Sequence, residues 1–265
     1  MTLQQNLVSL IMGCPSRLIT LQFLEMLSLM GKRFVQNEWP SLVPELSSYL
    51  AIEPSKPHNL QCSKLALEAI KKICKKYRYM FRSDDLYREM NYMIENLSVH
   101  LLSNLIFAVS SLEQINSAPD GNHSEVKLLI STANSVLHII ESVLSQEELP
   151  DFYEENLEQI TQACTFLLAN EFPLMQNNST DREAVFRAKA KVVRLVHLYQ
   201  FKFGEYFATH ADLFFQSIWQ VVADNRVTAA REAERLVFAL VKYIGECTNI
   251  GNYSEFIKQN LALLF

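Results

Sequence analysis

The chain has 265 residues, a formal net charge of −5 and hydrophobic residues at 49% of its positions. This length exceeds the usual size of a single hydrophobic core, so it predicts either two compact domains or one elongated stack. The negative net charge argues against a protein that coats nucleic acid and favours a protein partner.

The composition predicts an all-α protein. Only 6 Gly and 8 Pro interrupt the sequence, and no stretch shows the alternation of a half-buried strand. The 5 cysteines are odd in number and lack metal-ligand spacing, which favours reduced, structural thiols. We expect neither a secretion signal nor an apolar run that approaches a membrane span, and therefore no membrane insertion.

The first elements are a short helix over residues 1–12, which is half of a hairpin, and a widely apolar helix over residues 16–34. A third helix follows Trp39, and Pro40 and Pro44 fall near its first turn, where they need not break it. Trp39 is predicted to plug the corner between the paired helices. The alternative is a binding hot spot at the surface.

Residues 64–96 give the clearest helical hairpin. Ala66, Ile70, Ile73 and Tyr77 recur at three- and four-residue spacing and predict one buried face. Ser83 is then the expected N-cap of a second helix that runs to about residue 115.

Further helices are expected over residues 126–144 and from Leu149 onward. The spacing of Thr180 and Glu183 predicts a capping box at the start of the next helix, which Gly204 would end. Three more helices are expected to begin near residues 210, 226 and 253.

An isolated hairpin of this kind leaves apolar surface exposed, so the pattern predicts a single HEAT-type array over residues 1–265. The expected hairpins cover residues 16–50, 59–115, 124–170, 180–222 and 226–265, with residues 1–12 as a half hairpin.

Nothing in the sequence predicts catalysis or a cofactor. The glycines are isolated, no HExxH or GxSxG motif occurs, and the 6 histidines are scattered. Adjacent carboxylates such as Asp84 and Asp85 point in different directions on a helix, which suits helix-start electrostatics better than acid/base chemistry. A binding protein without enzymatic activity is therefore expected.

Charge segregation is the main functional signal. No Lys or Arg occurs between Lys127 and Arg182, and the middle of this interval is crowded with carboxylates, namely Glu141, Glu147, Glu148, Asp151, Glu154, Glu155 and Glu158. One interpretation is an ordinary solvated face, and the alternative is that an acidic ridge of Asp151, Glu154, Glu155 and Glu158 receives a basic partner. Residues 70–82 carry six cations and invite a nucleic-acid interpretation, but their tyrosines serve equally well as core residues.

Three stretches carry a resemblance to a known family. PSRLITLQFLEMLSLMGKRFVQNEWPSLVPEL, residues 15–46, resembles the N-terminal region of the importin-β superfamily of transport receptors. More specific are KKYRYMFRSDDLYREM, residues 75–90, and LPDFYEENLEQI, residues 149–160. In this order and spacing they are similar to the CAS-type exportins, which return importin-α to the cytoplasm.

The resemblance implies a right-handed α-solenoid whose second helices line the inner, binding side. It implies Ran-GTP and importin-α as partners, nucleoporin FG repeats as a further candidate, and shuttling between nucleus and cytoplasm. Family members are much longer, so we expect this chain to lack the first repeats and most of the later ones.

The resemblance assigns partner contacts to this chain only as exposed positions on the second helix of each expected hairpin. These positions are Ser41, Glu45, Ser48, Asp84, Asp85, Arg88, Tyr92, Asp151, Glu154, Glu155 and Glu158. Two alternatives stay open: an import receptor of the same superfamily, and a helical-repeat adaptor unrelated to Ran.

Overall fold

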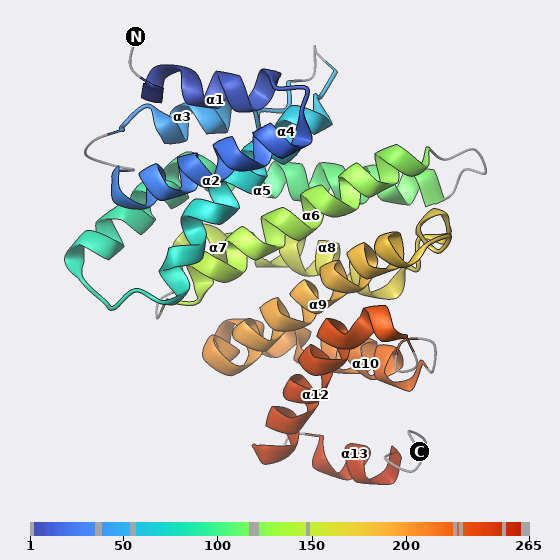
Figure 1. The fold of residues 1–265 in the computed structure, drawn as a ribbon. Helices are drawn as coiled ribbons and strands as arrows, with labels where there is room; N and C mark the ends of the chain where they lie inside the picture. The colour runs from blue at the N-terminus through green and yellow to red at the C-terminus, as the bar shows by residue number, and fades with distance from the viewer. Residues whose placement is uncertain are drawn as a thin grey trace. The chain divides into compact units, whose positions relative to one another are not determined.

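The fold is taken from a computed structural model that describes residues 3–34, 39–53, 57–116, 122–146, 149–224, 227, 230–250 and 253–260. Over these residues all regular secondary structure is helical and no strand is formed (Figure 1). The prediction of an all-α chain is confirmed.

The helices follow one another along the chain and are joined by short connections. The α-helices are α1 (Leu3–Gly13), α2 (Arg17–Phe34), α3 (Leu42–Ser48), α4 (Leu60–Cys74), α5 (Asp84–Asn116), α6 (His123–Leu144), α7 (Asp151–Glu155), α8 (Leu157–Ala169), α9 (Ser179–Lys202), α10 (Gly204–Ala223), α12 (Glu234–Asn249) and α13 (Ser254–Asn260). Short 3₁₀ turns are η1 (Lys75–Arg78), η2 (Pro173–Met175) and η3 (Arg231–Ala233).

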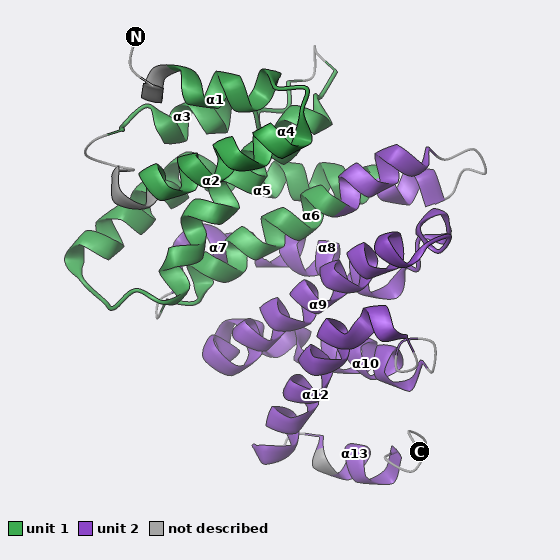
Figure 2. Ribbon diagram, viewed as in Figure 1, with its two compact units in different colours: residues 1–111, 131–148 green, residues 112–130, 149–265 purple. Residues whose placement is uncertain are grey.

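The chain divides into two compact units (Figure 2). Unit 1 comprises residues 1–111 and 131–148, and unit 2 comprises residues 112–130 and 149–265. The single array over residues 1–265 stays a prediction.

In unit 1, α2 packs against α4, and α1 packs against α2, α3 and α4. Gly31 permits the close approach of α2, because a Cβ there would lie 3.1 Å from Cγ1 of Ile73 on α4. Trp39 is 3% exposed, as expected of a residue that plugs the corner before α3. The Ser47 hydroxyl donates to the carbonyl of Asn96 at 3.1 Å, which joins α3 to α5.

In unit 2, α9 packs against α8, α10 and α12, and α8 packs against α10. Aromatic side chains fill the space between these helices. The rings of Tyr199 and Phe207 stack with centroids 5.7 Å apart, and Phe207 contacts Phe214 at 5.5 Å. Tyr153 of α7 is also buried.

Several boundaries differ from the sequence prediction. The helix expected from near residue 226 is α12, which begins only at Glu234, because Ala230 is extended and Arg231–Ala233 form a 3₁₀ turn. Asn156, at φ −104° and ψ 15°, interrupts the helix expected after Leu149 and separates α7 from α8. The capping box at Thr180 is wrong, because Asn178 is the N-cap of α9 and accepts from the amide of Asp181 at 2.9 Å. Helix α10 begins at Gly204, earlier than expected, because only Phe203 separates it from α9.

Helices α5 and α6 each contain an 18-residue window that is apolar enough, by length and composition, to cross a membrane. This corrects the expectation that no apolar stretch approaches a span. In α6, 72% of the window is buried inside the structure, as in the core helix of a soluble protein. The absence of membrane insertion stays a prediction.

Candidate functional site

The α3 group of expected contact residues lies in unit 1. Ser41 and Ser48 are exposed, and Glu45 is half-buried. The Ser48 hydroxyl donates to the carbonyl of Glu45 at 2.7 Å. Burial raises the pKa of Glu45. This group therefore presents a small polar surface with one partly desolvated carboxyl.

The α5 group lies on the first turns of that helix. Ser83 caps it as predicted, since its hydroxyl accepts from the amide of Leu86 at 3.2 Å. Asp85 and Arg88 are exposed and form an ion pair at 2.5 Å, and Asp84 is exposed beside them. The hydroxyl of Tyr92 donates to the carbonyl of Pro40 at 3.1 Å.

That hydrogen bond from Tyr92 brings the α3 and α5 groups together. Tyr92 is half-buried and its pKa is raised by burial. Part of this side chain therefore holds the turn before α3 and is not free for a partner.

The third group, here called the acidic surface, consists of Asp151, Glu154, Glu155 and Glu158 on α7 and α8 in unit 2. All four side chains are exposed, as the helical spacing predicts. The carboxylate of Glu158 accepts from Gln162 at 2.9 Å and lies 3.6 Å from Nε2 of His210. Over the described parts of the chain, the other three carboxylates form no ion pair or side-chain hydrogen bond.

Glu141, which lies in the same acidic stretch of the sequence, is not on a solvated face, contrary to one interpretation of that stretch. It is 8% exposed and forms an ion pair with Arg78 at 2.7 Å in unit 1. Arg78 also donates to the Ser142 hydroxyl at 2.9 Å and to the His138 carbonyl at 3.2 Å. Glu147 and Glu148 lie outside the described residues.

The basic stretch over residues 70–82 is largely engaged inside unit 1. Lys76 forms an ion pair with Glu89 at 2.6 Å, and the Tyr77 hydroxyl donates to the same carboxylate at 2.9 Å. Lys72 pairs with Glu25 of α2. Tyr77 is fully buried, so it is a core residue and not a platform for nucleic-acid bases.

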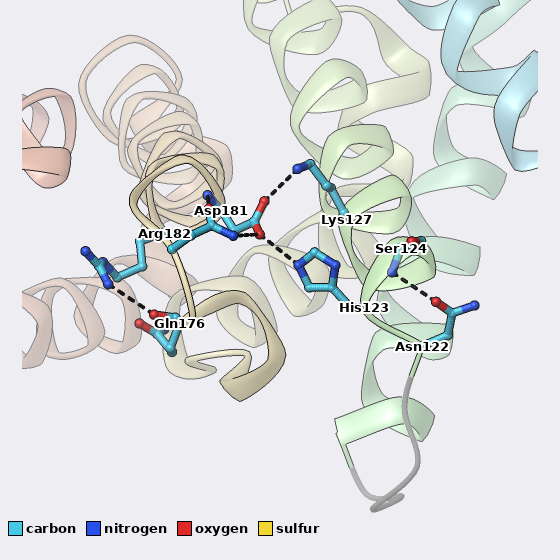
Figure 3. A network of polar contacts seen from close by, with 8 residues as sticks. Asn122, His123, Ser124, Lys127, Gln176, Asp181 and Arg182 are labelled. Atoms are coloured by element: carbon cyan, nitrogen blue, oxygen red, sulfur yellow. Dashed lines mark hydrogen bonds and ion pairs between the residues drawn. The ribbon is translucent and has the colours of Figure 1, made fainter.

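A buried carboxylate connects α6 to α9 within unit 2 (Figure 3). The Asp181 side chain is fully buried. It accepts from Lys127 Nζ at 2.7 Å and from Asn178 at 2.5 Å, and it lies 2.7 Å from Nε2 of His123. The hydrogen bond from Lys127, with those of Asn178 and His123, lowers the pKa of Asp181 to about 2. These contacts hold α6 and α9 together, and both oxygens of the buried carboxylate have hydrogen-bond partners.

The Asp181 network predicts an acid dependence of stability. A carboxyl whose folded-state pKa is depressed stabilises the fold above its unfolded-state value, and this contribution disappears as the pH falls from about 4 to about 2. Asp181→Asn is expected to cost about 1–3 kcal/mol near neutral pH, because the charged acceptor is lost. Urea unfolding at several pH values should show a flatter acid limb for Asp181→Asn, and parallel curves would contradict this assignment.

In the part of the chain that the structure describes, no group of three or more His, Cys, Asp or Glu side chains that could hold a metal ion is found. Burial raises the pKa of the Cys164 thiol to about 12 and that of Cys247 to about 11. These thiols therefore stay protonated at neutral pH and are poor nucleophiles.

Sequence reasoning missed an exposed apolar segment between η1 and α5. Tyr79, Met80 and Phe81 are 75%, 41% and 96% exposed. The available signal was three large apolar residues in succession just before the N-cap Ser83, where no helical periodicity assigns them to a core.

Comparison with known proteins identifies the fold and the family. The profile of the Cse1 family matches residues 73–264, more than half of the chain. A solved structure described as the exportin Cse1 in its cargo-free, cytoplasmic state matches with a TM-score of 0.81 and 20% identity, covering 96% of this chain and 26% of that chain. This likeness confirms a helical solenoid.

Curated relatives agree. The chain is 23% identical to exportin-2 of Dictyostelium discoideum, over 90% of this chain and 24% of the relative. It is 23% identical to the importin alpha re-exporter of Saccharomyces cerevisiae, over 98% of this chain and 26% of the relative. The chain thus spans about a quarter of the length of these relatives. Because the family profile covers most of its length, the chain belongs to the Cse1 family.

Proposed function

We propose that this chain is a segment of a nuclear export receptor that binds importin-α together with Ran-GTP, without catalysing a reaction. The observation that carries the proposal is the match of the Cse1 family profile over residues 73–264. The name of the yeast relative, importin alpha re-exporter, supplies the cargo. Such a receptor shuttles between nucleus and cytoplasm, with nucleoporin FG repeats as a further candidate partner.

The acidic surface supports a basic partner on physical grounds. Its Asp151, Glu154 and Glu155 carboxylates are exposed and lack partners among the described residues, so bringing a cation to them breaks no internal ion pair. A single-sign surface attracts an oppositely charged partner and raises its association rate. The α3 and α5 groups of unit 1 supply a second, mixed polar surface.

Binding of importin-α to this chain, measured with and without Ran bound to a non-hydrolysable GTP analogue, tests the proposal. We expect Ran-GTP to tighten importin-α binding by about 5- to 150-fold, the usual range of such coupling. The coupling must be reciprocal, so importin-α has to tighten Ran-GTP binding by the same factor. Ran-GDP is the control and should leave the affinity unchanged.

The other outcomes distinguish the alternatives. An import receptor would lose cargo affinity when Ran-GTP is added, and an adaptor unrelated to Ran would not respond to it. If the chain is folded by circular dichroism and binds neither protein, the proposal is wrong for this chain.

A further inference from the structure

Helix α10 of unit 2 presents an apolar row that neither of its neighbours covers. Tyr206 and Leu213 are 47% and 51% exposed, and with His210 between them they follow the spacing i, i+4 and i+7 along one side of the helix. Helix α10 packs on α8, and on its other side the ring of Trp219 contacts that of Phe256 on α13 at 5.3 Å. The row is therefore an open face of a helix whose two flanks are already packed.

Carboxylates border this row on two helices. Glu205 and Asp212 are exposed on α10 beside it. Across the contact with α8, a carboxylate oxygen of Glu158 lies 3.6 Å from Nε2 of His210, which places the acidic surface next to the row. Helices α7, α8 and α10 contain no Lys or Arg. The combined surface is thus apolar in the middle and anionic around it.

These carboxylates are available to an incoming cation. Within the described residues, Glu205 forms no ion pair or side-chain hydrogen bond, as is also true of the unpaired carboxylates of the acidic surface. Asp212 accepts only a neutral donor, the hydroxyl of Tyr253 at 2.5 Å. The charge on this surface is therefore not neutralised by a lysine or arginine of the described chain.

We propose that this surface binds a segment of a protein partner in which one large apolar side chain is flanked by lysine or arginine. Tyr206 and Leu213 are about 10 Å apart along the helix axis, which leaves room for one side chain between them, over His210. The flanking cations would then lie near Glu158 and Glu205. The inference deepens the proposed function and rests on it, because it adds an apolar requirement to a surface assigned there to a basic partner.

The two parts of the surface have different effects on recognition. Exposed carboxylates attract any cationic segment, and this attraction weakens as salt is added. Burial of an apolar side chain between Tyr206 and Leu213 adds affinity that charge cannot supply, about tenfold or more for a leucine. The apolar row therefore allows the protein to select among basic segments.

The experiment measures fluorescence anisotropy with two labelled peptides, a lysine-rich peptide with a central leucine and the same peptide with serine in its place. The wild-type chain should bind the leucine peptide about tenfold tighter. Tyr206→Ser/Leu213→Ser should bind both peptides equally, with the affinity that the wild type shows for the serine peptide. A third peptide, with glutamate in place of every lysine around the leucine, should not bind.

A matched control removes exposed apolar side chains from another second helix. Val99 and Ile106 on α5 are 60% and 40% exposed, and Val99→Ser/Ile106→Ser should keep the tenfold preference. Circular dichroism shows whether each variant is folded, since substitutions at exposed positions are expected to change stability little.

Three outcomes would overturn the inference: equal binding of the leucine and serine peptides by the folded wild type, an unchanged preference in Tyr206→Ser/Leu213→Ser, or equally tight binding of the glutamate peptide. None of these peptides contains importin-α or requires Ran. A failure of the chain to bind those two proteins would contradict the proposed function and leave the peptide preference in place, so the two failures are distinguishable.

Discussion

Glu141→Ala is expected to lower the free energy of unfolding by about 3–5 kcal/mol, the usual cost of removing one partner from a buried ion pair. Arg78 would remain in place with only 17% of its side chain exposed and would lose its carboxylate, keeping the neutral Ser142 and His138 acceptors. An uncompensated buried charge is costly because the surrounding protein solvates it poorly. Denaturant unfolding followed by circular dichroism measures the effect.

Two further variants test whether the loss of stability comes from leaving the buried charge of Arg78 unpaired. Replacing both partners, as Arg78→Met/Glu141→Leu, should recover most of the lost stability, because no unpaired charge is left. Glu183→Ala breaks the more exposed pair of Glu183 with Arg187 and should cost less than about 1 kcal/mol. A loss of under about 1 kcal/mol for Glu141→Ala would mean that Arg78 is solvated in some other way.

Charge reversal on the acidic surface has the second large expected effect. Glu154→Lys/Glu155→Lys/Glu158→Lys is expected to weaken binding of importin-α in the presence of Ran-GTP by about tenfold or more, equivalent to about 1.4 kcal/mol. Most of the change should appear in the association rate and should shrink as salt is added, because exposed charges act at long range and are screened. Surface plasmon resonance at two ionic strengths measures both.

The matched control applies the same change in charge to the first helices of three hairpins. Glu125→Lys/Glu183→Lys/Glu234→Lys alters positions on α6, α9 and α12 and should bind with nearly the wild-type rate. If both triple variants lose affinity equally, net charge alone explains the effect. In that case the acidic surface is not the contact.

Much of the candidate site was predictable because it depends on local periodicity. The exposure of Asp151, Glu154, Glu155 and Glu158 follows from their helical phase relative to the buried Tyr153. The helix start at Ser83 was predictable for the same reason, since capping involves residues within one turn. The α9 cap was also a local problem, but Asn178 competes with Thr180 in the sequence and makes the better N-cap.

The sequence alone determined an all-helical chain and the buried faces of its hairpins, because these features arise from contacts between near neighbours. The resemblance to the exportin family was also available from the sequence, because contiguous motifs carry it. Only the tertiary structure decided which charged residues form ion pairs inside the fold. Arg78 and Glu141 are 63 residues apart in the sequence, and Lys127 and Asp181 are 54 apart, yet each pair meets. The position of a residue on its own helix does not predict such ion pairs. Whether a charged residue is buried or exposed depends on which side chains the neighbouring helix places against it.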